Sequence, residues 1–173
     1  MVERINGGIS LSAYMSDNIW KPLGISSATF RLNENAETSR RLVTMSQRTS
    51  SGHLEPRGPV RNPNPPTEYG GSGLFMSPDD FMKILISLLK NDGKLLKPET
   101  LETMYMPQVQ NIRDLLDMLS DESLGPMLSG GLPEVKSWNF GLGGLLNTND
   151  VDGVCRKGTM SWCGLPNLFC EYH

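Results

Sequence analysis

Near its carboxyl end the chain contains the stretch GTMSWCGLPN at residues 158–167, and this stretch decides how the fold is interpreted. Small or polar side chains alternate there with Met160 and Trp162, and a period of two residues predicts a β-strand. Gly164 and Pro166 interrupt the alternation and predict a turn. A strand edge that ends in small residues can direct its N–H groups at a substrate carbonyl, as stabilising an acyl-transfer oxyanion requires. A core strand followed by a turn is the simpler interpretation of the same residues.

Two segments on either side of this strand predict partners for it. Apolar residues alternate with small or polar ones over 138–146, which predicts a strand. The apolar members of that pattern are Trp138, Phe140, Leu142 and Leu146. With the strands expected over 154–163 and 167–172, it predicts an antiparallel sheet at the end of the chain.

Helical signals occupy residues 1–24 and 74–120. At the start, Gly7-Gly8 is expected to end one helix, Ser10 to cap the next and Pro22 to end that one. The later section predicts a helix beginning at Pro78, a helix beginning at Pro98 and a third over 112–119. Helices first and strands last are typical of an α+β protein.

Residues 31–70 are polar and irregular. They predict a short strand over 42–45, followed by a surface connector through the proline-rich run from Pro56 to Pro66. A second linker, from Gly125 to Pro133, separates the helical section from the predicted strands.

The best-defined helix contains a formal Ser-x-x-Lys sequence, Ser87-Leu88-Leu89-Lys90. Ser77 is its N-cap, and Asn91-Asp92-Gly93 ends it. Its apolar stripe, predicted to be buried, consists of Phe81, Ile84, Leu85, Leu88 and Leu89. Lys90 is a cation favourably placed at a helix C-terminus. The pattern favours a structural helix over a nucleophile with its base, so Ser87→Ala should leave any acyl-transfer activity unchanged.

Composition bounds the function classes. A chain of 173 residues with 38% hydrophobic residues can bury the core of one domain. The net charge of −3 does not point to nucleic acid or an anionic membrane as partner. Apolar runs are too short to span a bilayer, and Met1-Val2-Glu3-Arg4 is not a signal peptide. We therefore expect a soluble, cytoplasmic chain, although a targeting segment of a longer parent would lie upstream of Met1.

The three cysteines are Cys155, Cys163 and Cys170. An odd number without a Cys-x-x-Cys pair is unlike a disulfide framework or a zinc ribbon. Cys163 is interpreted as a small, buried apolar residue and not as a nucleophile, because no histidine is near it in sequence. We expect neither a metal nor a cofactor.

Four segments occur in a definite order along the chain. They are IWKPLGI at 19–25, GGSGLFMSPDDF at 70–81, LLKPETL at 95–101 and WCG at 162–164. Their order and spacing resemble the serine beta-lactamase and penicillin-binding-protein superfamily, especially its esterase and transesterase branch. The WCG triplet stands where that superfamily carries its third motif, Lys-Thr-Gly in beta-lactamases and often Trp-Gly-Gly in the esterases.

The resemblance implies what the chain contains and what it lacks. The superfamily uses a serine nucleophile with a lysine three residues later, and a tyrosine as proton shuttle. Both motifs precede the segment that this chain resembles, so we expect a fragment truncated at both ends, without catalytic residues of its own. In the parent, Trp162, Cys163 and Gly164 would line the acyl pocket, with the Leu165 N–H as oxyanion donor. A lid or cleft-wall role for residues 31–70 is the alternative to a plain connector.

The resulting prediction is an α+β fragment of the beta-lactamase/transpeptidase-like fold. Residues 1–173 form one partial domain, with a mainly helical portion at 1–124, including the 31–70 loop region, and a sheet portion at 134–173. The parent would transfer acyl groups from ester, amide or β-lactam substrates through an acyl-serine, and the chain alone would be inactive. The expected partners are a small-molecule acyl substrate and a second copy bound through an exposed sheet edge. A non-catalytic binding or regulatory protein, or a scaffold without a small-molecule role, are the alternatives.

Overall fold

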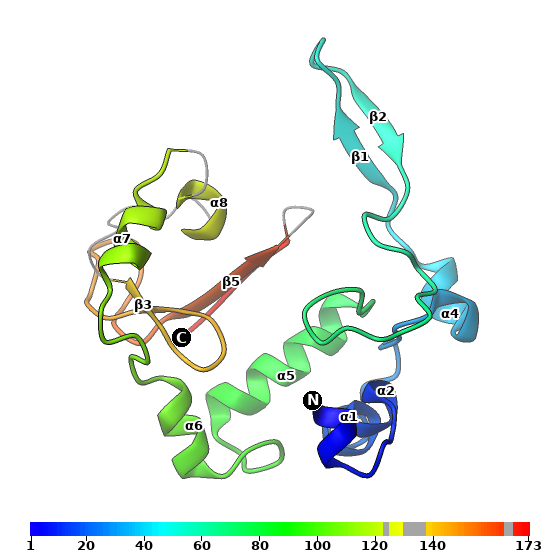
Figure 1. Cartoon of the computed structure of the whole chain (residues 1–173), viewed down its shortest axis with the longest axis horizontal. Coiled ribbons are helices and arrows are strands. Elements are labelled where there is room, and N and C mark those ends of the chain that lie inside the picture. The colour runs from blue at the N-terminus through cyan, green and yellow to red at the C-terminus, as the bar shows by residue number, and fades with distance from the viewer. Residues whose placement is uncertain (123–124, 130–137, 165–167) are drawn as a thin grey trace. The chain divides into compact units, whose positions relative to one another are not determined.

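The computed structural model describes residues 1–122, 125–129, 138–164 and 168–173 (Figure 1). The chain divides into two compact units, Met1–Ser87 and Leu88–His173. Helix α5 (Pro78–Lys90) continues across that division. Each unit is described by itself below.

The first unit begins with a run of short helices, as the sequence predicts. They are α1 (Val2–Ile5), α2 (Leu11–Met15), the π-helical turn η1 (Ser16–Trp20) and α3 (Lys21–Leu23). Ser10 caps α2 by accepting a hydrogen bond from the Ala13 N–H at 3.2 Å. The expectation that Pro22 ends the helix is wrong. Pro22 lies in the first turn of α3, where its missing N–H costs nothing, and the run ends at Gly24 with φ +62°.

Residues 31–70 contain more regular structure than expected. The 3-10 turn η2 (Leu32–Glu34) and helix α4 (Ala36–Arg40) precede an antiparallel ribbon of β1 (Met45–Arg48) and β2 (Leu54–Arg57). The strand expected over 42–45 therefore begins only at Met45. The apolar run at 42–45 did not predict the strand bounds. Strand β1 is defined by its pairing with β2 and not by burial, because Leu54 and Val43 are exposed.

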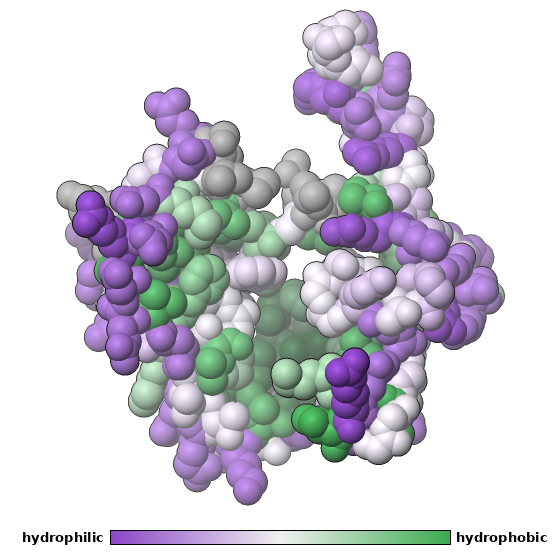
Figure 2. Space-filling model, in the orientation of Figure 1, coloured by the Kyte–Doolittle hydropathy of each residue, from purple (hydrophilic) through white to green (hydrophobic). Residues whose placement is uncertain are grey.

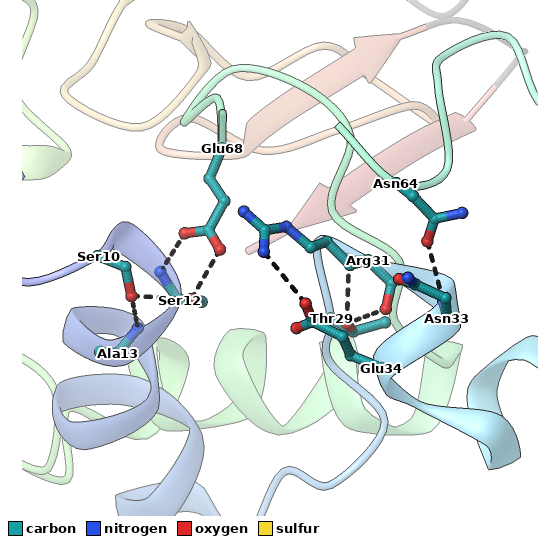
Figure 3. A network of polar contacts seen from close by, with 9 residues as sticks. All are labelled: Ser10, Ser12, Ala13, Thr29, Arg31, Asn33, Glu34, Asn64 and Glu68. Carbon is teal, nitrogen blue, oxygen red and sulfur yellow. Dashed lines mark hydrogen bonds and ion pairs between the residues drawn. The ribbon is translucent and has the colours of Figure 1, made fainter. Parts of the chain in front are cut away.

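Hydrogen bonds connect the proline-rich run and the residues after it to other segments of the first unit (Figure 3). The Pro63 carbonyl accepts a hydrogen bond from the Leu32 N–H at 2.9 Å, and Asn64 Oδ1 accepts one from the Asn33 N–H at 2.9 Å. Further along, the Glu68 carboxylate accepts hydrogen bonds from the N–H and hydroxyl of Ser12 at 2.7 and 2.8 Å. A carboxylate at the first turn of α2 also complements the helix dipole.

The core of the first unit forms around Trp20, Ile25 and Phe30. The rings of Trp20 and Phe30 lie 6.5 Å apart. Partly buried side chains from α2, η1, α3 and α5 and from two connecting segments pack against these three: Leu11, Met15, Ile19, Leu23, Ala28, Met76 and Ile84. Burial of this apolar cluster is what holds helices too short to be stable alone.

Helix α5 has the predicted bounds but not the predicted buried face. Ser77 accepts a hydrogen bond from the Asp80 N–H at 3.2 Å, which confirms the cap. Within the expected stripe Leu85 is buried, but Phe81 and Leu89 are 39% and 44% exposed. Polar residues take part of the buried face instead, since Asp80 and Ser87 are only 5% and 4% exposed. Hydrogen bonds formed by Asp80 explain its burial, as shown below.

The second unit combines helices with a four-stranded antiparallel sheet. The helices are α6 (Pro98–Met104), α7 (Arg113–Leu119) and α8 (Gly125–Ser129). The strands are β3 (Trp138–Phe140), β4 (Leu145–Asn147), β5 (Met160–Gly164) and β6 (Leu168–Tyr172), in the spatial order β3-β4-β5-β6. Leu115 and Leu119 of α7 pack on Trp138 and Leu145 to form the core of this unit.

The strand expected over 138–146 is in fact a hairpin of β3 and β4. Phe140 pairs with Leu145, and the chain turns through residues 141–144. Glycines make this turn feasible, because a Cβ on Gly144 would lie 2.5 Å from the Ser161 carbonyl oxygen. The alternation of apolar residues continued through a turn, so the pattern alone did not reveal it.

Candidate functional site

The predicted site residues lie on or next to β5. Trp162, Cys163 and Gly164 form its carboxyl half. Leu165 lies outside the described residues, so its role as oxyanion donor stays a prediction. The amino half of β5 is completely buried, with Met160 and Ser161 both at 0% exposure. One strand thus has a rigid buried half followed by an accessible half.

The two described neighbours of β5 pair with different lengths of it. β6 pairs with β5 along its full length, from Met160 opposite Tyr172 to Gly164 opposite Leu168. The described pairing of β4 with β5 is limited to Leu145 opposite Ser161 and Leu146 opposite Met160. The two halves of β5 therefore differ in their described strand neighbours as well as in burial.

Trp162 is exposed and nevertheless held in position. Its side chain is 52% exposed. The ring of Phe140 meets it edge-on, with centroids 6.1 Å apart and an interplanar angle of 61°. Phe140 in turn packs against the core cluster of the second unit. Aromatic pairs in this arrangement are stabilised by about 0.5–1.5 kcal/mol beyond burial, so the indole has a preferred orientation.

Sequence reasoning did not single out Phe140 as part of the site. It assigned Phe140 to a strand but gave no indication that its ring meets a residue 22 positions later. The β3-β4-β5 strand order brings Phe140 to Trp162. Predicting that order would have required recognising the turn at residues 141–144.

Cys163 lies on the opposite face of β5 from Trp162, because successive side chains of a strand alternate. Its Sγ donates a hydrogen bond to the Leu128 carbonyl at 3.4 Å. Burial raises the pKa of the Cys163 thiol. Cys170 and Cys155 also have raised pKa values, chiefly through burial. A raised pKa keeps a thiol protonated at neutral pH, which agrees with a packing role for Cys163.

Gly164 is open to its surroundings, unlike the glycines of the β3-β4 turn. A Cβ added to Gly164 would meet no described atom within 4 Å. A Cβ added to Gly144 would lie 2.5 Å from the Ser161 oxygen. Gly144 is therefore required by packing, whereas contacts with described atoms do not require a glycine at position 164.

Tyr172 of β6 pairs with Met160 of β5, and its environment does not suit proton transfer. Its hydroxyl donates a hydrogen bond to Met160 Sδ at 3.0 Å. Burial, with contributions from Tyr105 and Cys170, raises the pKa of Tyr172 to about 12. A phenol with this pKa is neutral at pH 7 and is a poor general base. Tyr172 is part of the packing around β5.

The Ser-x-x-Lys sequence in α5 does not present its two residues together. Ser87 is 4% exposed on the buried side of the helix, and Lys90 is exposed at the helix end. A nucleophile needs an accessible hydroxyl with a base in hydrogen-bonding range. These positions fit the structural helix that the sequence predicts.

Metal and membrane sites were searched over the described ranges. No group of three histidine, cysteine, aspartate or glutamate side chains among the described residues could hold a metal ion. No helix in the described portion is long and apolar enough to cross a bilayer.

Helices combined with an antiparallel sheet are consistent with the beta-lactamase class of fold. The family model described as Beta-lactamase matches residues 1–151, and the chain belongs to that family. The match ends before β5, so the assignment of residues 162–164 to the third motif stays a prediction.

Curated relatives and solved structures extend the similarity over nearly the whole chain. The chain is 35% identical to monacolin J acid methylbutanoyltransferase of Aspergillus terreus over 97% of its own length and 42% of the relative. It is 35% identical to lovastatin esterase of Penicillium rubens over 95% of its length and 42% of the relative. Unliganded simvastatin synthase (LovD) from Aspergillus terreus superposes with a TM-score of 0.86 at 33% identity, covering 99% of this chain and 42% of that one. The chain thus spans about two fifths of the length of the relatives it matches.

Proposed function

We propose that this chain supplies the acyl-site wall of a serine-dependent acyltransferase or esterase. The observation that carries the proposal is the carboxyl half of β5, where an exposed but oriented indole lies two residues before a glycine that no described atom crowds. The relatives named above are an acyltransferase and an esterase, which supports acyl transfer as the reaction class.

In this proposal Trp162 and Gly164 contact the acyl group, and Cys163 supports the strand from its other face. The apolar indole favours an aliphatic acyl chain, and the absence of a side chain at Gly164 leaves room for a branched one. Backbone N–H groups at this end of β5, with that of Leu165 among them, would donate hydrogen bonds to the carbonyl oxygen as it becomes an oxyanion.

The covalent step needs groups from outside these 173 residues. A serine hydroxyl attacks the acyl carbonyl, its proton passes to the lysine and tyrosine bases, and the alcohol, thiol or amine of the donor leaves with a proton. A second alcohol, or water, then takes the acyl group from the serine. The family resemblance places the nucleophile and bases before the segment matched here, so the chain alone is proposed to be inactive.

A chimaera tests the proposal. This chain replaces the matched segment of the Aspergillus terreus methylbutanoyltransferase, whose remaining part is expected to supply the serine, lysine and tyrosine. Hydrolysis of p-nitrophenyl butanoate and intact-mass detection of an acylated serine are the readouts. We expect turnover and acylation by the chimaera, and neither by the isolated chain.

The alternative functions give different results in the same experiment. A folded chimaera that binds the ester without acylation or turnover would contradict the proposal and favour a non-catalytic binding protein. Turnover by the isolated chain, abolished by Ser87→Ala, would also contradict it, because the nucleophile would then lie in α5. The unmodified methylbutanoyltransferase is the positive control.

A further inference from the structure

The ribbon of β1 and β2 stands apart from the core of the first unit. From Arg40 to Arg61 every residue is exposed except Met45, Thr49 and Val60, which are partly buried. Figure 1 shows the two strands extending as a pair from the segment that follows α4. A two-stranded hairpin without a packed face is at best marginally stable in water. The ribbon therefore contributes little to the core of the first unit, and most of its side chains are exposed in the described structure.

The ribbon has the opposite charge from the rest of the chain. Residues 40–61 include five arginines, no lysine and one acidic residue, Glu55, which gives a net charge of +4. The whole chain has a net charge of −3, so the remaining residues carry −7. Figure 2 shows hydrophilic residues over most of the ribbon surface. A concentration of one sign of charge on an exposed segment attracts partners of the opposite sign.

Four of these five arginines have no acidic partner in the described part of the chain. Arg40 pairs with Glu37 at 2.7 Å, and Arg48 donates a hydrogen bond to the Gly52 carbonyl at 2.7 Å. No ion pair joins Arg41, Arg57 or Arg61 to any described residue. Arginine binds carboxylates in a planar, two-point arrangement that lysine cannot form.

Apolar side chains accompany the arginines. Val43 is 79% exposed, Leu54 is 61% exposed and Leu42 is 41% exposed. Arginine next to exposed aliphatic residues is typical of protein interfaces, where arginine is enriched. Platforms for single-stranded nucleic acid require aromatic rings, and residues 40–61 contain no Phe, Tyr or Trp.

We propose that the ribbon from Arg40 to Arg61 is a docking surface for an acidic protein partner. Carboxylates of the partner pair with Arg41, Arg57 and Arg61, and its apolar side chains cover Val43 and Leu54. This surface does not depend on the acyl-transfer proposal, because no ribbon residue belongs to the acyl-site wall.

Binding of defined probes to the 173-residue chain tests the proposal. The main probe is a fluorescein-labelled peptide of four Glu-Glu-Leu-Ser repeats. A peptide of equal charge with serine in place of leucine and a short DNA duplex are compared with it by fluorescence anisotropy at low and physiological salt. We expect the leucine-containing peptide to bind most tightly, and the affinity to fall as salt rises.

Two double variants, each of which replaces two cations with glutamate, distinguish docking on the ribbon from non-specific electrostatic attraction to the whole chain. Arg57→Glu with Arg61→Glu is expected to weaken binding of the main probe by about tenfold or more. Lys97→Glu with Lys157→Glu alters exposed cations of the second unit and is expected to change it by less than about twofold. Circular dichroism and thermal unfolding confirm that each variant is folded.

A variant in which a short Gly-Ser linker replaces Arg41–Arg61 should lose the same binding while retaining the fold of the first unit. Equal losses in both double variants would overturn the proposal, as would unchanged binding after removal of the ribbon. Tighter binding of the duplex than of either peptide would also overturn it and indicate nucleic acid as the partner.

Discussion

Two regions of the molecule place polar and apolar side chains in opposite environments. The Ser27–Asp80 network of the first unit buries polar groups, whereas the carboxyl half of β5 in the second unit exposes an apolar ring. The Asp80 carboxylate is buried and accepts hydrogen bonds from the N–H groups of Ser26 and Ser27 and from the Ser27 hydroxyl, at 3.0, 2.8 and 2.7 Å. Lys83 donates a fourth at 2.6 Å. In β5 the indole of Trp162 is left half exposed.

The difference separates residues that stabilise the fold from residues available for binding. A buried carboxylate with four donors is costly to disturb. An exposed indole forgoes hydrophobic stabilisation that its burial would provide, and a ligand that covers it recovers that stabilisation. Changes in the first region should therefore affect unfolding, and changes in the second should affect acyl transfer.

The largest expected effect is on unfolding and follows from Asp80→Ala. It leaves the Ser26 and Ser27 donors without their acceptor in a buried site, and we expect a loss of about 3 kcal/mol in the free energy of unfolding. Urea denaturation followed by circular dichroism measures it. Lys83→Met is the control and should cost less than about 1 kcal/mol, because the Lys83 side chain is 42% exposed. Equal losses in the two variants would mean that the ion pair, and not the serine donors, stabilises the network.

The same network predicts a specific response to acid. Burial opposes the charged form of Asp80, but hydrogen bonds from Lys83, Ser27 and Ser26 outweigh it and hold the pKa of Asp80 well below the ordinary value of 3.8. A lowered folded-state pKa means that the stabilisation is complete above the unfolded-state value and is lost as pH falls toward the folded-state value. Between about pH 4 and pH 2 the wild type should lose more stability than Asp80→Asn. Parallel curves would contradict this.

Two glycines of the second unit sharpen the comparison. Gly144→Ala places a Cβ against the Ser161 carbonyl and should destabilise the chain by about 2 kcal/mol. Gly164→Ala meets open space and should change stability by less than about 0.5 kcal/mol, while lowering kcat/KM of the chimaera by about tenfold. Thermal unfolding and ester hydrolysis measure the two effects. Unchanged kcat/KM in Gly164→Ala would show that the acyl group lies elsewhere.

A smaller effect is expected from Phe140→Leu. This change removes the ring that orients Trp162 while keeping an apolar side chain on the core, so kcat/KM of the chimaera should fall by about fivefold. The fluorescence anisotropy of the Trp162 indole should fall as well, because the ring loses its neighbour. A change that only destabilised the fold would not be expected to lower this anisotropy. Phe169→Leu, at an exposed position of β6, is the control and should leave both quantities unchanged.

The smallest expected effect is that of Ser87→Ala, which should change ester hydrolysis by the chimaera by less than about twofold. Ser87 is buried in α5, so a modest decrease in thermal stability is compatible with the account. A large loss of kcat with an unchanged fold would make α5 part of the catalytic machinery.

The features that could be predicted from the sequence are local ones. Ser10 and Ser77 cap α2 and α5 as predicted, because an N-cap acts within three residues of itself. The strand expected over 154–163 is confirmed only in its second part, because β5 runs from Met160 to Gly164 and residues 152–154 form a turn.

The features that could not be predicted depend on contacts between distant parts of the chain. Asp80 looks like a first-turn helix residue, but its burial depends on donors 53 and 54 positions away. The β3-β4 turn was concealed by glycines within an alternating pattern, and the contact of Phe140 with Trp162 was concealed with it. Relatives and family membership establish the class of fold, and the tertiary structure adds which end of β5 is exposed.

The most direct test of the central claim is to map where the acyl group lies. The chimaera is acylated with a butanoyl ester carrying a diazirine, irradiated and analysed by peptide mass spectrometry. The account predicts cross-links to β5 residues 162–164, with Trp162 as the main site and a strong decrease in Trp162→Ala. Efficient acylation with cross-links only to residues of the first unit would contradict the assignment of β5 as the acyl-site wall.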